Sequence, residues 1–171
     1  DIISIYAPDK EQVVYCMKCW WSEKYTPTDY AQDYDPNKPF FVQLATLLKR
    51  TPLPNLIASP DAEENNCHYV NCAGNNKDCY MLLDSDSNQD CYYSNGLNSS
   101  KNCIDCLYVS DSELCYESVD CSKCYNLFYS QDCSNCHDSY FLKNCVSCNN
   151  CILSTNLQHK EYYINNQPYS K

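Results

Sequence analysis

Glycine is almost absent from this chain, which contains 2 glycines in 171 residues. Glycine-rich phosphate loops and dinucleotide-binding fingerprints are therefore missing, and with them the usual signs of a nucleotide-dependent enzyme. Histidine is also scarce, at 3 residues, and no Ser-His-Asp order is present. We expect His68, His137 and His159 to be solvated surface residues, and we predict that the protein is not an enzyme.

Long hydrophobic runs and basic clusters are missing as well. No stretch approaches the ~18 consecutive apolar residues of a membrane-spanning helix, and no signal peptide is visible. Lysine and arginine number 12 against 22 acidic residues, which gives a net charge of −10. Because nucleic-acid affinity comes mainly from neutralised phosphates, an acidic chain of this kind is a poor nucleic-acid binder. We predict neither a nucleic-acid nor a membrane partner.

Cysteine is abundant, with 16 residues, and it recurs at a fixed period. Three series have members spaced by 12 residues: Cys67, Cys79, Cys91, Cys103 and Cys115; Cys121, Cys133 and Cys145; and Cys124, Cys136 and Cys148. A fixed period indicates one structural unit stacked on copies of itself.

The repeat places small or apolar residues three apart. With Cys67 as position 1 of a 12-residue coil, positions 1, 4, 7 and 10 hold mostly Cys, Ser, Ala, Val and Leu. A spacing of three fits neither a strand nor a helix over a long run. It predicts a β fold, a tight parallel β-solenoid (β-helix) of about 8 coils over residues 67–171, whose narrow lumen excludes larger side chains. The predicted lumen thiols are Cys67, Cys79, Cys91, Cys103, Cys106, Cys115, Cys121, Cys124, Cys133, Cys136, Cys145, Cys148 and Cys151.

Asparagine and aspartate recur at positions 6 and 12 of the coil, as at Asp84, Asp90 and Asn102. These residues tolerate left-handed backbone and hydrogen-bond their own turns. Since glycine is so rare, they must supply the corners. The pattern predicts two corners per coil, which divide each coil into two similar halves.

Aromatic residues gather at positions 2 and 3, whereas positions 8 and 9 are mostly polar. One side of the stack is therefore predicted to present an aromatic ladder. We call this the aromatic face: Tyr80, Tyr92, Tyr93, Tyr116, Phe128, Tyr129, Tyr140 and Phe141.

The redox state of the cysteines has three interpretations. Reduced thiols could fill the lumen as small hydrophobes, the cysteines could form a disulfide scaffold, or the lumen could hold a metal or cluster. In-coil disulfides would need a repeated pair, but only Cys115 and Cys121 lie half a coil apart in one coil. Reduced thiols place the protein in the cytoplasm, and disulfides would make it extracellular.

Residues 1–60 do not follow the repeat. Cys16 and Cys19 have the spacing of one zinc-ribbon knuckle, which is half of a tetrahedral thiolate site. A Zn²⁺ ion here would need ligands from outside this chain. Two buried thiols or a disulfide are the alternative interpretation.

An amphipathic helix is predicted over about residues 39–50 in the same segment. Pro39 suits a helix start. The residues expected on one helical face are Phe40, Phe41, Leu44, Leu47 and Leu48. Pro52, Pro54 and Pro60 then indicate an extended linker. Since a solenoid must cover its terminal rung, we expect this helix and Trp20–Trp21 to cap the first coil or cover the aromatic face.

The repeat resembles two known patterns. The inward spacing of three resembles the 12-residue β-helix of beetle antifreeze proteins, but those bind ice through threonine arrays, and this solenoid contains one threonine, Thr155. The whole chain also resembles a Cys- and Tyr-rich repeat family of candidate-phyla-radiation bacteria. The matching stretches are Ile2–Tyr6, Val14–Ser22, Pro39–Phe41, Asn76–Tyr80, Asp90–Ser94, Tyr129–Cys133 and Tyr162–Ile164. That resemblance implies a zinc ribbon beginning before Asp1, with Cys16 and Cys19 as its second knuckle.

These patterns together favour a non-enzymatic scaffold. A rigid acidic solenoid would present its aromatic face to a partner protein or to its own N-terminal segment. Two alternatives stay open. Paired lumen thiols such as Cys121 and Cys124 could bind Zn²⁺ or an iron–sulfur cluster or carry out redox chemistry, or an open last coil, residues 151–171, could assemble end to end with another copy.

Overall fold

The computed structural model describes residues 4–22, 24–57 and 64–170. The chain divides into two compact units, Asp1–Pro60 and Asp61–Lys171. Two expectations, the linker residue Pro60 and the matching stretch at Ile2–Ile3, lie outside the described residues.

The first unit is small and mostly irregular. Its elements are β1 (Val14–Tyr15), α1 (Met17–Trp20), a 3-10 helix (Pro27–Tyr30), α2 (Phe40–Arg50) and β2 (Leu53–Pro54). β1 pairs with β2 in parallel, and the ring of Trp20 stacks on Tyr25 at 4.5 Å. The predicted helix is present as α2, and Pro39 is its N-cap. None of its side chains is buried, and Phe41 is 79% exposed.

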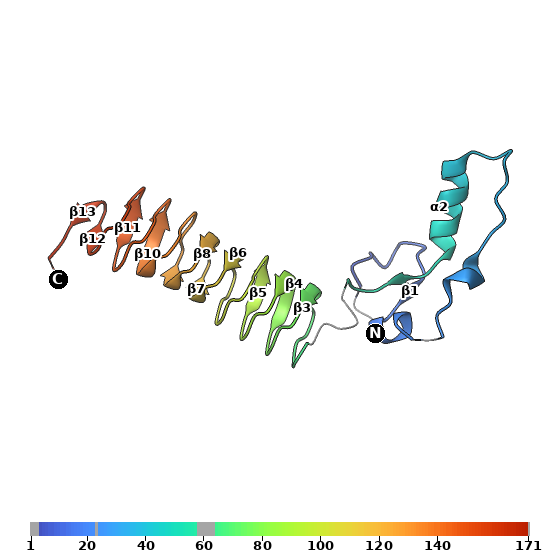
Figure 1. Ribbon diagram of the computed structural model, residues 1–171, viewed down its shortest axis with the longest axis horizontal. Coiled ribbons are helices and arrows are strands. Elements are labelled where there is room, and N and C mark those ends of the chain that lie inside the picture. Colours follow the sequence, from blue (N-terminus) through green and yellow to red (C-terminus); the bar gives the residue numbers. More distant parts are fainter. Residues whose placement is uncertain (1–3, 23, 58–63, 171) are drawn as a thin grey trace. The chain divides into compact units, whose positions relative to one another are not determined.

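The second unit is a parallel β-solenoid, which confirms the predicted fold class. Figure 1 shows the strands following one another in a single stack from green to red. They are β3 (Asn71–Gly74), β4 (Tyr80–Asp86), β5 (Tyr92–Asn95), β6 (Leu107–Ser110), β7 (Glu113–Tyr116), β8 (Val119–Ser122), β9 (Tyr125–Phe128), β10 (His137–Lys143), β11 (Ile152–Thr155), β12 (Tyr163–Ile164) and β13 (Gln167–Pro168).

Each coil has four walls, and each wall forms its own parallel ladder. The outward residues at positions 2, 5, 8 and 11 pair with residues 12 further along the chain, as in Tyr80↔Tyr92, Asn71↔Leu83, Asp86↔Asn98 and Lys77↔Gln89. On every wall, the register therefore pairs each residue with the residue 12 positions further along the chain.

Backbone hydrogen bonds join each coil to the coils on both sides. The Tyr80 N–H donates to the carbonyl of Cys91, 3.1 Å away in the following coil, and the Met81 N–H donates to the carbonyl of His68, 3.0 Å away in the preceding one. The same pattern recurs along the stack. Each coil consists of four triplets, each made of an inward residue, an outward residue and a corner residue. The pattern pairs the N–H groups of the outward and corner residues, and this pairing stabilises the fold because buried backbone donors are costly when unpaired.

The corners differ from the prediction, because every coil has four rather than two. Positions 3, 6, 9 and 12 all have positive φ, from Asn66 (53°) through Tyr93 (52°) and Leu114 (56°) to Asn165 (49°). A left-handed residue other than Gly, Asn or Asp costs about 1 kcal/mol or more. The sequence marks only positions 6 and 12 because Tyr, Met, Leu and Ser adopt this backbone at many of the other corners.

The lumen is filled by the residues at positions 1, 4, 7 and 10. The buried lumen cysteines are Cys79, Cys91, Cys103, Cys106, Cys115, Cys121, Cys124, Cys133, Cys136, Cys145, Cys148 and Cys151. Leu82, Leu97, Val109, Leu127 and Leu142 lie among them. Cys67, in the first coil, is only half-buried and packs against this cluster.

Inward backbone N–H groups explain why the lumen uses Ser and Asn. The Leu97 N–H donates to Ser85 Oγ at 3.1 Å, and the Ser100 N–H donates to Asn88 Oδ1 at 2.9 Å. The Cys106 N–H likewise donates to Ser94 Oγ at 3.0 Å. Each acceptor lies 12 residues before its donor, so a lumen side chain satisfies the third N–H of the triplet in the next coil.

The N-terminal mouth of the lumen is occupied by Glu64. Its Oε1 accepts a hydrogen bond from Asn76 Nδ2 at 3.1 Å, and Asn76 Oδ1 in turn accepts from the Asn88 N–H at 3.0 Å. A polar side chain therefore continues the lumen column beyond the first coil.

The last coil carries a hairpin that the sequence analysis did not predict. β13 pairs with β12 in antiparallel order, Ile164↔Gln167 and Tyr163↔Pro168. The turn residues Asn165 and Asn166 both have positive φ, as a type I′ turn requires. Pro168 has no N–H to offer a further strand. At this wall β13 is therefore the edge of the stack, and end-to-end assembly stays a prediction.

Candidate functional site

The aromatic face lies along one wall and one corner of the solenoid. Its position-2 residues pair in register, as in Tyr116↔Phe128 and Phe128↔Tyr140. The rings follow the same spacing: Phe128 stacks on Tyr140 with centroids 5.2 Å apart, and Tyr129 stacks on Phe141 at 5.1 Å. Backbone register therefore fixes the orientation of the rings.

The predicted ladder is divided into two clusters. Tyr69, Tyr80 and Tyr93 meet edge to face in the first coils, with centroids 5.1 and 5.5 Å apart. The second cluster begins at Tyr116, and Ile104 occupies the same column between the two clusters.

The corner column is interrupted at the same level by two carboxylates, Asp105 and Glu117. The Glu117 carboxylate, hydrogen-bonded to Tyr116, raises the pKa of that hydroxyl to about 12. The middle of the aromatic face is therefore acidic.

The outer surfaces of the rings are open. Tyr93 is 57% exposed, Phe141 is 50% exposed and Tyr129 is 44% exposed. The rings contact one another but do not contribute to the lumen cluster. In the described part of the solenoid, these rings therefore form an exposed apolar surface that is not part of the buried core.

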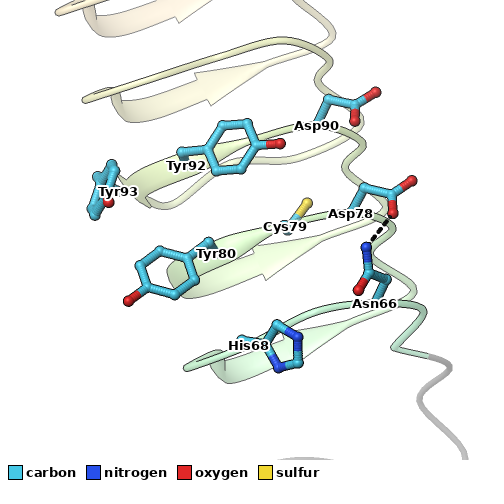
Figure 2. Close-up of a pocket in the computed structure, with 8 residues that line it drawn as sticks. All are labelled: Asn66, His68, Asp78, Cys79, Tyr80, Asp90, Tyr92 and Tyr93. Carbon is cyan, nitrogen blue, oxygen red and sulfur yellow. Dashed lines mark hydrogen bonds between the residues drawn. The ribbon is translucent and has the colours of Figure 1, made fainter.

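A shallow depression of about 550 Å³ lies at the N-terminal end of the aromatic face. Its lining residues are drawn in Figure 2: Asn66, His68, Asp78, Cys79, Tyr80, Asp90, Tyr92 and Tyr93.

Acidic and aromatic side chains lie on opposite borders of this depression. Figure 2 shows Asp78 and Asp90 along one border, and the Tyr92 ring reaching across the wall toward them. Asn66 Nδ2 donates to Asp78 Oδ1 at 2.7 Å. Burial raises the pKa of Tyr92, and the negative charge of Asp90 adds to that effect.

Most lumen thiols have a raised pKa, whereas hydrogen bonding to Cys103 and Cys121 lowers the pKa of Cys106 and Cys124, respectively. Hydrogen bonding to the neighbouring thiols Cys103 and Cys124 raises the pKa of Cys91 and Cys121, respectively, to about 12, and burial contributes to both shifts. The Cys91 thiol donates a hydrogen bond to the carbonyl of Gln89 at 3.3 Å, and this bond requires the protonated form of the thiol. Every cysteine is unpaired in the structure.

Cys72 is not one of the predicted lumen thiols, and it lies outside the lumen at a corner, position 6, with φ of 50°. It is half-buried, unlike the lumen thiols of the following coils. The sequence indicates this corner position, since Asp84 and Asp120 occupy the same position in other coils.

Cys16 and Cys19 form a local pair in the first unit. Cys16 is the N-cap of α1, and its Sγ accepts the Cys19 N–H at 3.4 Å. That bond lowers the pKa of Cys16, while the neighbouring Cys16 sulfur raises the pKa of Cys19. Two thiols supply half of the ligands of a tetrahedral zinc site. Within residues 4–22, 24–57 and 64–170, no group of three or more His, Cys, Asp or Glu side chains could hold a metal ion.

Fold and site together define a cysteine- and tyrosine-rich β-solenoid of 12-residue coils that carries aromatic clusters. No protein-family model matches the chain, and no curated protein matches it. The bacterial repeat family and its zinc ribbon therefore stay predictions. Among the helices of the described residues, none is long and apolar enough to cross a membrane.

Proposed function

We propose that the protein is a non-enzymatic scaffold whose aromatic face binds a partner protein. The observation that supports this proposal is the exposure of Tyr93, Tyr129 and Phe141 on a wall whose lumen core is complete without them. Aromatic side chains are enriched at protein interfaces because they bury a large area at low entropic cost.

The solenoid suits such a role because its backbone register holds the rings in fixed positions. Ring pairs such as Tyr129–Phe141 are already ordered in the free chain, so binding loses little side-chain entropy. Self-association is disfavoured by the net charge of −10, since like-charged copies repel. The N-terminal segment of the chain is the rival occupant, because the apolar side chains of α2 are also exposed.

A neutral hydrophobic dye such as Nile red tests this proposal on the full chain. Wild type should increase the dye fluorescence, and Tyr129→Ser with Phe141→Ser should reduce the increase. The substitutions remove two cross-coil ring contacts, Tyr116–Tyr129 and Tyr129–Phe141, so the free energy of unfolding should fall by only about 1–2 kcal/mol. Tyr125→Ser is the control, because Tyr125 is similarly exposed but lies on another wall.

Two results would contradict the proposal. A loss of folding in the double variant would show that the rings serve stability. Dye binding that appears only after removal of residues before Glu64 would show that the N-terminal segment covers the aromatic face.

Zinc binding at Cys16 and Cys19 is a second proposal. It is supported by the Cys19 N–H bond to Cys16 Sγ, which favours the thiolate form that Zn²⁺ binds. Titration of the chain with Co²⁺ should give thiolate-to-cobalt absorption that Cys16→Ser abolishes. A spectrum unchanged by that substitution would remove this proposal.

We propose the cytoplasm as the location of the protein. The lumen thiols are free and donate hydrogen bonds to carbonyls, as Cys91 does to Gln89. Such thiols persist in a reducing compartment.

A further inference from the structure

We propose that the depression at the N-terminal end of the aromatic face binds the cationic side chain, arginine or lysine, of a basic segment of a partner protein. This inference rests on the proposed function and names the chemistry of the partner. The residues that carry it are Asp78, Asp90, Tyr80, Tyr92 and Tyr93.

The two carboxylates are one coil apart and lack a counter-ion. Asp78 and Asp90 occupy the same corner column, 12 residues apart. They accept hydrogen bonds from neutral amides, Asn66 Nδ2 at 2.7 Å and Gln89 Nε2 at 3.1 Å, and neither forms an ion pair among the described residues. Like charges in neighbouring strands repel, and a bound cation would remove that repulsion.

Aromatic rings form the other border of the same depression. Tyr80 and Tyr93 meet edge to face at 5.5 Å, which fixes both rings. The hydroxyl end of Tyr92 lies toward the carboxylates (Figure 2). A cation within about 6 Å of a tyrosine ring is attracted by its π face. The solenoid already contains one such contact, with Lys160 Nζ 5.8 Å from the centroid of Tyr163.

Charge also excludes other occupants. The chain carries −10, which repels a second copy and nucleic acid alike. A guanidinium group satisfies both borders at once, because its donors match carboxylates and its plane stacks on aromatic rings. Its aliphatic stem would lie on the apolar part of the wall.

The probe is a ten-residue peptide of alternating Arg and Ser, with a matched peptide that has citrulline in place of Arg. Its affinity for the full chain is measured by fluorescence anisotropy at low and at physiological salt. Citrulline has the shape of arginine without its charge. We expect the Arg peptide to bind about tenfold more tightly than the citrulline peptide.

Matched variants locate the site. Asp78→Asn with Asp90→Asn should weaken binding of the Arg peptide about tenfold. The control, Asp120→Asn with Asp132→Asn, removes the same charge from another corner, where the residues are also one coil apart. Each column already contains asparagine in later coils, at Asn102 and Asn144 respectively, so both variants should fold.

A second pair of variants tests the rings. Tyr92→Leu should weaken binding of the Arg peptide, whereas Tyr125→Leu, on another wall, should not. Circular dichroism of each variant verifies folding.

The outcomes separate this inference from the proposed function. Equal weakening by the two aspartate pairs would reduce the effect to general attraction by an acidic surface and overturn the inference. Failure of the Arg peptide to bind would also overturn it. In that case, dye binding that is lost with Tyr129→Ser and Phe141→Ser would leave the scaffold role intact, and absence of dye binding would remove both.

Discussion

Alkaline pH should unfold the solenoid, because its lumen holds thiols that can ionise only after unfolding. Cys91, Cys121 and Cys133 are at most 2% exposed. Hydrogen bonding to neighbouring thiols, together with burial, raises the pKa of each to about 12 from the ordinary value of 9.0.

The sign of the effect follows from these raised pKa values. Below about pH 9 both states hold the proton, so the thiols contribute their full stabilisation. Between about pH 9 and 12 the unfolded chain loses the proton while the folded chain keeps it, and stability falls with rising pH. One thiol costs about 1.4 kcal/mol per pH unit, so these three together cost about 4 kcal/mol per pH unit. Since typical domains are stable by about 5–15 kcal/mol, we expect unfolding near pH 10–11.

Urea titrations followed by circular dichroism, from about pH 7 to about pH 11 with reductant present, measure this slope. The matched variant replaces Cys91, Cys121 and Cys133 by serine, which already occupies lumen positions such as Ser94 and Ser130. Its stability should fall less steeply, by about 4 kcal/mol per pH unit. Identical slopes in wild type and variant would refute the reasoning.

Three further predictions concern single positions. Leu127→Ala should lower the free energy of unfolding by about 3 kcal/mol in urea titrations, because Leu127 is fully buried in the lumen; a change below about 1 kcal/mol would contradict the packed lumen. Gly96→Ala should lower the thermal midpoint, because Gly96 has φ of 71° and a new Cβ would clash with the Tyr108 ring; adding Tyr108→Ala should recover part of the loss, and no recovery would place the cost in the backbone alone. Glu117→Gln should lower the pKa of Tyr116 from about 12 toward 10.0, as measured by phenolate absorbance; an unchanged titration would show that the carboxylate does not act on this hydroxyl.

The sequence predicted the solenoid well because the lumen is so narrow. Only small side chains fit inside, so the inward columns repeat visibly, as Cys79, Cys91 and Cys103 do. Helix α2 was also predictable, since Pro39 and the apolar spacing after it agree. These features depend on local rules that a single chain reveals.

The corners at positions 3 and 9 were not predictable in the same way. Tyr93 and Leu114 adopt left-handed backbone although their side chains disfavour it. The register of neighbouring coils imposes this conformation, and no residue type marks it. The C-terminal hairpin did have a signal, the Asn165–Asn166 pair, which suits a turn with two positive φ angles.

The aromatic face was predicted as one continuous ladder, and its division into two clusters was missed. Ile104 and Asp105 interrupt the rings of the neighbouring coils, and side-chain contacts rather than column membership decide which rings meet. The depression beside Asp78 and Asp90 was missed for a related reason. The depression forms where corner residues lie beside wall residues in space, and the repeat pattern of the sequence does not show how these side chains are arranged.

A thiol count on native and unfolded protein tests the sulfur-lined lumen most directly. With a thiol reagent under non-reducing conditions, the native chain should react rapidly only at Cys16, Cys19 and Cys72, which are exposed or half-buried. Half-buried Cys67 should react slowly, because burial raises its pKa to about 12. In denaturant all 16 cysteines should react. Rapid reaction of most cysteines in the native chain, or fewer than 16 in denaturant, would contradict a lumen of buried, reduced thiols.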